Sequence, residues 1–353
     1  MYRVLFLADK TVDDPRMEGT SHPGGAELTD AAAVDACPWP VEVLRADEVD
    51  PAHLKDFDVH IVGNFDASNQ ALTDELCRLG RHVLFEHDLR ICFWRGNFPA
   101  APEYIHRYGQ RCICPHPHLR RLYDRARGAI FLTHRQLAAF RANPFFGVDN
   151  ALVLGTSLMN RDFFSRVDAQ SETRRNIEGC VMYSSSAFKG YEPARRYCVE
   201  RGCEPFVIRN LSPEEVLDVF ERTRQFVYLP RGREAAGRMV LEARFLGCEV
   251  VANQNVAICQ ESWWHLGDDK ALEVVRDGPK RFWRLVQRLC RRSDGEPTTS
   301  GGGRLRRAVD PMVNAGLSLI QRVGCTGPLI RRMTAQSRSA ECHPRVVSRP
   351  TRR

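Results

Sequence analysis

The sequence predicts an α/β protein made of two doubly wound domains. Short apolar runs of strand length alternate with segments of helical length along most of the chain. The clearest unit covers residues 226–253, FVYLPRGREAAGRMVLEARFLGCEVVAN, which predicts a buried strand, a loop, a helix near residues 237–247 and a second buried strand. At 353 residues, the chain is long enough for two such domains.

The composition is that of an ordinary soluble protein, with 43% hydrophobic and 27% charged residues. No run of about 18 apolar residues predicts a membrane span. The N-terminal MYRVLFLADK predicts a first strand and not a signal peptide, so we expect a cytoplasmic protein. The 13 cysteines follow no repeating spacing, which favours reduced, buried thiols over a disulfide framework.

The first half predicts strands at 2–8, 41–44, 59–62, 82–85 and 129–133, with helices at 28–36, 69–79 and 119–127. A polar loop, 9–23, leads from the first strand to Gly24 and Gly25. Two glycines after a first strand let the backbone approach a ligand closely, although a flexible turn before a helix would also use them.

A CxCxHxH run, made of Cys112, Cys114, His116 and His118, suggests a metal site. Zinc ligands are normally separated by two or more residues, and four ligands this close rarely surround one ion. The run therefore favours a loop before the 119–127 helix, and no metal is expected.

The second half predicts strands at 180–184, 205–209, 226–229 and 249–252, and a last regular helix at 270–289. Ser212 and Glu215 form a capping box at a further helix start. Glu234 precedes the 237–247 helix and Glu242 lies on it. The backbone N–H groups near Ala236, Gly237 and Arg238 would attract an anion between these carboxylates. Acceptors for sugar hydroxyls beside a phosphate-binding helix end suit a nucleotide-sugar, whereas a solvated helix face is the alternative.

Glu234-x7-Glu242, followed by Ala243, Leu246-Gly247 and a Val-Val strand, resembles the donor-site signature of retaining glycosyltransferases with the GT-B fold, and of family four ("glycosyl transferases group one") in particular. The family's E-G-F-G stretch is here Glu-Ala-Ala-Gly, so only its last glycine is kept. The resemblance covers roughly residues 1–290. It implies GT-B architecture, two Rossmann-like domains facing across a cleft, with Glu242 binding the ribose and Glu234 the donor sugar.

Further matches to that family lie elsewhere in the chain. Gly24-Gly25-Ala26-Glu27 matches a stretch that contacts the donor diphosphate or the acceptor, and His87 matches a strand-end histidine near the donor sugar, although a structural histidine is as common there. Lys189-Gly190 matches a pair whose lysine neutralises the diphosphate. The family's arginine before it is missing, so Arg231 or Arg233 would replace it. Arg209 falls where the family lines its base pocket.

The resemblance implies a retaining, metal-independent, hexosyltransferase-type glycosyltransferase that needs no cofactor beyond its UDP- or GDP-sugar donor. The sequence leaves the acceptor open: a glycan, a lipid or another hydroxyl. A non-catalytic nucleotide-sugar-binding relative and a glycosyltransferase of modified nucleic acid are the alternatives.

The predicted divisions are an acceptor-side domain at 1–155, a donor domain at 156–292 and a basic tail at 293–353. The tail is rich in Gly, Ser and Arg, which predicts disorder, with one short amphipathic helix at 312–323. It holds 11 arginines and four acidic residues, a net charge of +7, so residues 1–292 are neutral overall. Such a tail allows loose contact with anions, whereas a neutral body gives no broad footprint for nucleic acid.

Overall fold

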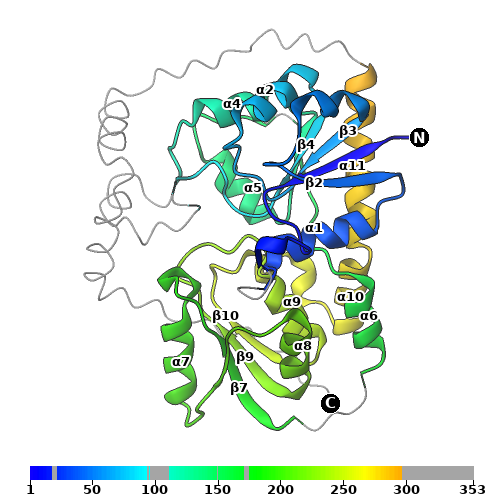
Figure 1. Ribbon diagram of the computed structural model, residues 1–353. Coiled ribbons are helices and arrows are strands. Elements are labelled where there is room, and N and C mark those ends of the chain that lie inside the picture. Colours follow the sequence, from blue (N-terminus) through cyan, green and yellow to red (C-terminus); the bar gives the residue numbers. More distant parts are fainter. Residues whose placement is uncertain (18–21, 94, 96–110, 149, 171–174, 296–353) are drawn as a thin grey trace.

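The computed structural model describes residues 1–17, 22–93, 95, 111–148, 150–170 and 175–295. Within this part of the chain, two parallel sheets form two lobes, one above the other in Figure 1. Helices cover both sheets, and helix α1 of the upper lobe lies above helix α9 of the lower lobe.

The first sheet has six strands in the order β2-β1-β3-β4-β5-β6. Its central strands are apolar and fully buried, as expected for a parallel sheet covered on both faces. The strands are β1 (Val4–Ala8), β2 (Val41–Arg45), β3 (Val59–Val62), β4 (His82–Glu86), β5 (Gly128–Phe131) and β6 (Ala151–Val153).

The second sheet has four strands in the order β10-β9-β7-β8. Strand β9 pairs in parallel with both β7 and β10, so the predicted strand, helix and strand of 226–253 form a βαβ unit at the centre and edge of this sheet. The strands are β7 (Ile177–Met182), β8 (Phe206–Ile208), β9 (Thr223–Tyr228) and β10 (Glu249–Ala252).

Most of the helices connect successive strands, whereas α10 and α11 follow the last strand. Ser212 caps one of the connecting helices through the predicted capping box with Glu215. The helices are α1 (Gly25–Asp35), α2 (Gln70–Leu79), α4 (Pro117–Arg125), α5 (His134–Arg141), α6 (Arg161–Asp168), α7 (Tyr191–Val199), α8 (Pro213–Arg222), α9 (Arg238–Phe245), α10 (Asp268–Arg276) and α11 (Gly278–Gly295).

The structure corrects the predicted elements near the end of the described chain. The single helix expected at 270–289 is two helices, because Gly278 and Pro279 interrupt it: proline lacks the N–H that a continuous helix would use. Helix α11 then runs to Gly295, past the point where a linker was expected. The rest of the predicted tail, including the 312–323 helix, lies outside the described residues.

Helix α11 returns to the first lobe. Phe282 and Trp283 are buried among residues of the first sheet, and the Trp283 indole donates to the carbonyl of Ala33 on α1 at 2.8 Å. Strand β6 ends at Val153, just before the predicted domain division. The proposed division at residue 155 stays a prediction.

Candidate functional site

A cleft of about 1070 Å³ lies between the two lobes, and both contribute to its walls. The upper lobe supplies the loop after β1 and the start of α1, and the lower lobe supplies β7, β8, α8 and α9. Five of the residues predicted from the sequence line this one cleft: Gly24, Gly25, Arg209, Arg238 and Glu242.

The start of α1 meets the start of α9 across the cleft. A Cβ placed on Gly25 would lie 3.6 Å from the Cβ of Arg238, an ordinary van der Waals contact, so the two helix starts are direct neighbours. Gly24 is the N-cap residue, and Glu27 accepts from its backbone N–H at 2.9 Å. The predicted glycine pair therefore forms a helix N-terminus at the cleft.

Helix α9 begins at Gly237, whose φ of +70° favours glycine, and no side chain caps this end. Ala236 precedes it and is buried. Arg238, the first residue of the helix, donates at 2.7 Å to Glu242, which lies one turn later. Both side chains are only 8% exposed. Arg238 also donates to the carbonyl of Leu158 at 2.6 Å, which holds the guanidinium at the junction of the lobes.

An aromatic and cationic surface forms another wall of the same cleft. The Arg209 guanidinium lies over the ring of Tyr183, 4.3 Å from its centroid, and both residues line the cleft. Tyr183 in turn packs edge-to-face against Tyr191 of α7. This arrangement orders the long Arg209 side chain and gives the wall a flat face.

Glu234 does not line the large cleft. It lines a smaller cavity of about 310 Å³, together with Asp88, Arg95 and Gln136 from the upper lobe. Its Oε1 lies 2.5 Å from Lys189 Nζ, so the predicted lysine and glutamate form an ion pair.

Tyr228 is buried beside that pair and hydrogen-bonds to Glu234. Burial, and then the Glu234 charge and this bond, raise the pKa of Tyr228 well above 10. The phenol thus stays protonated and supplies a donor to the carboxylate.

His87 is held by a carboxylate of α1. Its Nε2 lies 2.6 Å from Asp30 Oδ1, and Asp30 Oδ2 accepts from the backbone of Asn64 at 3.1 Å. Burial lowers the pKa of His87, but the Asp30 charge and hydrogen bond outweigh it, so its pKa is raised. His87 is not one of the described residues that line either cavity. We therefore find His87 behind the cleft wall, in a buried ion pair.

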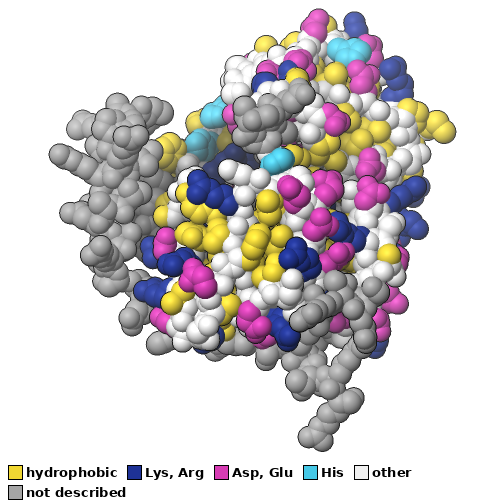
Figure 2. All heavy atoms as spheres, turned by 60° about the horizontal axis from the view of Figure 1, so that its bottom comes forward, with side chains coloured by type: hydrophobic (Ala, Val, Ile, Leu, Met, Phe, Trp, Pro, Cys, Tyr) yellow, Lys and Arg dark blue, Asp and Glu magenta, His cyan; other side chains and the backbone are white. Residues whose placement is uncertain are grey.

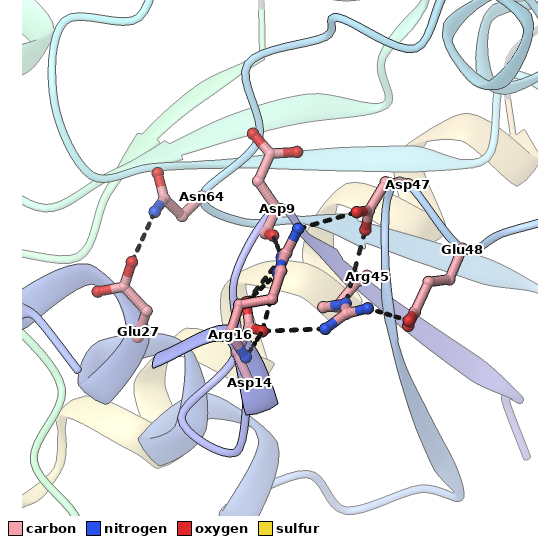
Figure 3. Close-up of polar contacts among 8 residues, drawn as sticks. All are labelled: Asp9, Asp14, Arg16, Glu27, Arg45, Asp47, Glu48 and Asn64. Atoms are coloured by element: carbon pink, nitrogen blue, oxygen red, sulfur yellow. Dashed lines mark hydrogen bonds and ion pairs between the residues drawn. The ribbon is translucent and has the colours of Figure 1, made fainter. Parts of the chain in front are cut away.

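The loop after β1 is anchored by two arginines (Figure 3). Arg16 donates to Asp14 at 2.7 Å and pairs with Asp47 at 2.9 Å, and Arg45 pairs with Asp14 at 2.9 Å. The hydrogen bonds from Arg16 hold the pKa of Asp14 well below its usual range. Figure 3 also shows Asn64 donating to Glu27, at 3.1 Å. These contacts fix the loop that forms the upper wall of the cleft.

Several hydrogen bonds join the lobes near the smaller cavity. Thr133 Oγ1 donates to the carbonyl of Ala235 at 2.8 Å. Glu261 is buried and accepts from both the backbone N–H of His134 and its ring, each at 2.8 Å. Glu261 thus places a carboxylate at the N-terminus of α5, where a negative charge is favourable.

Two arginines were expected to replace the one that the family pattern lacks here: Arg233 lines the smaller cavity, whereas Arg231 is exposed and lines neither cavity among the described residues. Sequence reasoning missed Tyr183, Asp30 and Asn64. Tyr183 could have been found by its position at the end of the predicted 180–184 strand. Asp30 contacts His87, 57 positions away, and Asn64 contacts Asp30, 34 positions away. Local sequence patterns do not reveal contacts between residues so far apart in the chain.

None of the described helices is both long and apolar enough to span a bilayer. On the face drawn in Figure 2, acidic and basic side chains are interspersed. This face therefore carries no extended field of one sign.

Comparisons with known proteins identify the fold. No family model matches the sequence, and no curated protein matches it. Among solved structures, AviGT4, a glycosyltransferase involved in avilamycin A biosynthesis, has a TM-score of 0.50 and 14% identity, covering 83% of this chain and 99% of its own. Anabaena Alr3699/HepE, in complex with UDP and glucose, has a TM-score of 0.48 and 13% identity, covering 84% and 100%. WaaG, a glycosyltransferase involved in lipopolysaccharide biosynthesis, has a TM-score of 0.41 and 13% identity, covering 83% and 95%.

At these identities the likeness concerns the fold alone. The predicted fold class, α/β with two parallel sheets that face each other across a cleft, is confirmed. The chain has the architecture of GT-B glycosyltransferases.

Proposed function

We propose that this protein is a glycosyltransferase that binds a nucleotide-sugar in the cleft between its lobes. The observation that carries the proposal is that the starts of α1 and α9, Arg209 and Glu242 all line one cleft. Its volume of about 1070 Å³ is slightly above the usual range of ligand pockets, about 300–1,000 Å³.

In this proposal each wall binds one part of the nucleotide. Tyr183 and Arg209 offer a flat surface to the base. Glu242, oriented by Arg238, accepts from the ribose hydroxyls. The uncapped N-terminus of α9 receives the diphosphate, because backbone N–H groups and the helix dipole favour an anion there, and Gly24 and Gly25 line the cleft opposite it without side chains.

The sugar then extends toward Glu234 in the smaller cavity. Lys189, beside Glu234, neutralises charge that develops on the leaving diphosphate, which is the main catalytic term we assign. We propose transfer with retention, in which the acceptor attacks on the face from which the diphosphate leaves. We assign His87 an indirect role, in which it orients Asp30 behind the start of α1.

The donor we infer is a UDP- or GDP-sugar, and the fixed positive groups make added divalent metal unnecessary. A thermal-shift screen with nucleoside diphosphates and their sugars tests binding directly. At a ligand concentration 100 times Kd, the stabilisation is about 2.7 kcal/mol. We expect one base to raise the melting temperature without Mg²⁺ or Mn²⁺. No shift with any nucleotide would contradict the proposal, and a shift that requires the metal would contradict its metal-independent part.

A further inference from the structure

Three buried cysteines meet in the upper lobe beside the smaller cavity. Cys92, Cys112 and Cys114 have their sulfur atoms within 4.8 Å of one another, and each is at most 2% exposed. Two of them belong to the closely spaced run before α4, whereas Cys92 comes from the turn after β4. The fold therefore brings a third thiol to a pair that the sequence alone leaves too closely spaced for a metal.

The surrounding groups donate hydrogen bonds to two of these sulfurs. The side-chain amide of Asn143 donates to Cys112 Sγ at 3.1 Å, and the backbone N–H of Phe93 donates to Cys114 Sγ at 3.3 Å. Asn143 is buried, and its amide also donates to the carbonyl of Cys114 at 3.0 Å. N–H donors directed at sulfur favour the thiolate form, which is the form that binds metal.

An imidazole lies next to one of these sulfurs. The side chain of His116 hydrogen-bonds to Cys114, and its Nε2 is buried without a hydrogen-bond partner. His116 also has a φ of +24°, a left-handed conformation that is uncommon for a non-glycine residue and places the ring at the start of α4.

Two simpler interpretations explain less. Ordinary core thiols behave as small apolar groups, and they need neither an amide donor nor a neighbouring imidazole nitrogen. A disulfide would use two of the three sulfurs and leave the third buried thiol and the neighbouring imidazole unexplained. A metal ion accounts for the three sulfurs, the donors and the buried nitrogen together.

We propose that Cys92, Cys112, Cys114 and His116 bind one structural Zn²⁺ ion. Three thiolates and one imidazole are a common tetrahedral zinc set, and soft thiolate ligands select zinc over the hard cations. Asn143 and the Phe93 N–H would act as outer partners that orient the sulfurs. Binding would release the thiol protons, including the one that Cys112 directs at the carbonyl of Ile91, 3.5 Å away.

The site would fix one wall of the smaller cavity. Cys92 lies between Asp88 and Arg95, which both line that cavity with Glu234. The turn is closed by backbone hydrogen bonds from Cys92 to Leu89 at 2.9 Å and from Arg95 to Cys92 at 2.8 Å. A metal bound at Cys92 would hold this turn against α4, independently of any role in the reaction.

Metal analysis of the intact chain, purified without chelator after growth with added zinc, tests the proposal. We expect about one zinc per chain in the parent and close to none in Cys92→Ser or Cys114→Ser. Cys259→Ser is the matched control, because Cys259 is equally buried, at 1%, but lies in the core of the second lobe. His116→Ala should weaken zinc binding by at least about tenfold, the loss that outer partners alone can cause.

Cobalt gives a readout that does not depend on the variants folding. The parent, stripped of zinc and titrated with Co²⁺, should develop thiolate-to-cobalt absorption that Zn²⁺ abolishes. A parent that takes up no zinc and gives no such absorption overturns the proposal, as does a disulfide among the three cysteines found in the unreduced protein. Unchanged affinity in His116→Ala overturns the assignment of the fourth ligand.

Discussion

Glu234 and Glu242 belong to one short stretch of sequence but have different partners. Glu234 pairs with Lys189 at the smaller cavity, and Glu242 pairs with Arg238 at the larger cleft. They are thus placed to bind different parts of one ligand. This separation gives each carboxylate its own test.

Glu234→Gln should lower turnover of the intact donor while leaving the affinity for plain nucleoside diphosphate within a few-fold. Loss of a charge-assisted bond to the sugar costs about 1.5–3 kcal/mol, which is a roughly 10- to 150-fold loss in kcat/KM. Initial-rate kinetics and diphosphate titration measure the two effects. Glu204→Gln is the control, because Glu204 is an exposed partner of Arg195. Equal losses in binding and turnover would contradict a role confined to the sugar.

Gly190, which follows Lys189, lies so close to the backbone of Leu229 that there is no room for a side chain. A Cβ on it would lie 2.0 Å from the carbonyl oxygen of Leu229, and its φ is +75°. Gly202 has the same φ, +75°, but nothing lies within 4 Å of its Cβ position. Gly202→Ala should therefore cost only the conformational term, about 1–2 kcal/mol, and Gly190→Ala about 2–5 kcal/mol. Urea unfolding of both variants measures the difference, and equal losses would show that the contact relaxes without cost.

Strand β3 contains a buried histidine, His60, and strand β4 begins with another, His82. These two histidines make the stability of the first lobe sensitive to acid. His60 Nε2 lies 2.8 Å from the carbonyl of Leu54, and both ring nitrogens of His82 face carbonyl oxygens, of Leu76 and Leu122. Burial lowers the pKa of each histidine to about 4. The unfolded chain, with a histidine pKa of about 6.5, then binds more protons between these values, so stability falls as the pH falls from about 6.5 to about 4.

Each of these histidines should cost about 2 kcal/mol of stability between pH 7 and pH 5. Asp9 acts in the opposite direction, because burial raises its pKa to about 6 and the folded state gains its proton first. Replacing His60 by Gln keeps a donor for Leu54 and should reduce the loss by about 2 kcal/mol. Urea unfolding at both pH values measures it, with the partly exposed His53→Gln as control. A His60→Gln protein with the parent's pH dependence would contradict this account.

The sequence predicted the helices and strands that are marked by the pattern of residues within one short stretch of the chain. The βαβ unit followed from two apolar strands around a helix that ends before Gly247, and the structure has β9, α9 and β10 there. The break at Gly278 was missed because apolar spacing continues on both sides of it. The return of α11 to the first sheet was not predictable either, since it depends on packing against α1.

The sequence predicted individual residues of the candidate site, but not which distant residues contact one another. Gly24, Gly25, Arg238 and Glu242 were predicted and share the cleft. The Lys189–Glu234 pair joins positions 45 residues apart, and the third thiol, Cys92, lies 20 positions before Cys112. Such contacts depend on how the strands are ordered in the sheet, and local sequence patterns carry no record of that order.

The two lobes of the molecule together line the cleft in which we propose that a nucleotide binds. The lobes are joined by polar contacts at the N-terminal end of α9: Arg238 to Leu158, and Thr133 to Ala235. The starts of α1 and α9 both line the cleft between the lobes. A ligand in the cleft would therefore contact both lobes at once.

The most direct test is titration of UDP and GDP against the parent and Glu242→Gln. If Glu242 accepts from the ribose, losing its charge removes about 1.5–3 kcal/mol, a roughly 10- to 150-fold loss in affinity. Glu221→Gln is the matched control, because Glu221 also pairs with an arginine, Arg166 at 2.6 Å, but lies outside the cleft lining. If Glu242 only neutralised Arg238, removing its charge would strengthen binding of the anionic diphosphate. Parent-like or tighter binding by Glu242→Gln would thus contradict a nucleotide site in this cleft, and weaker binding with an unchanged Glu221→Gln is the result we predict.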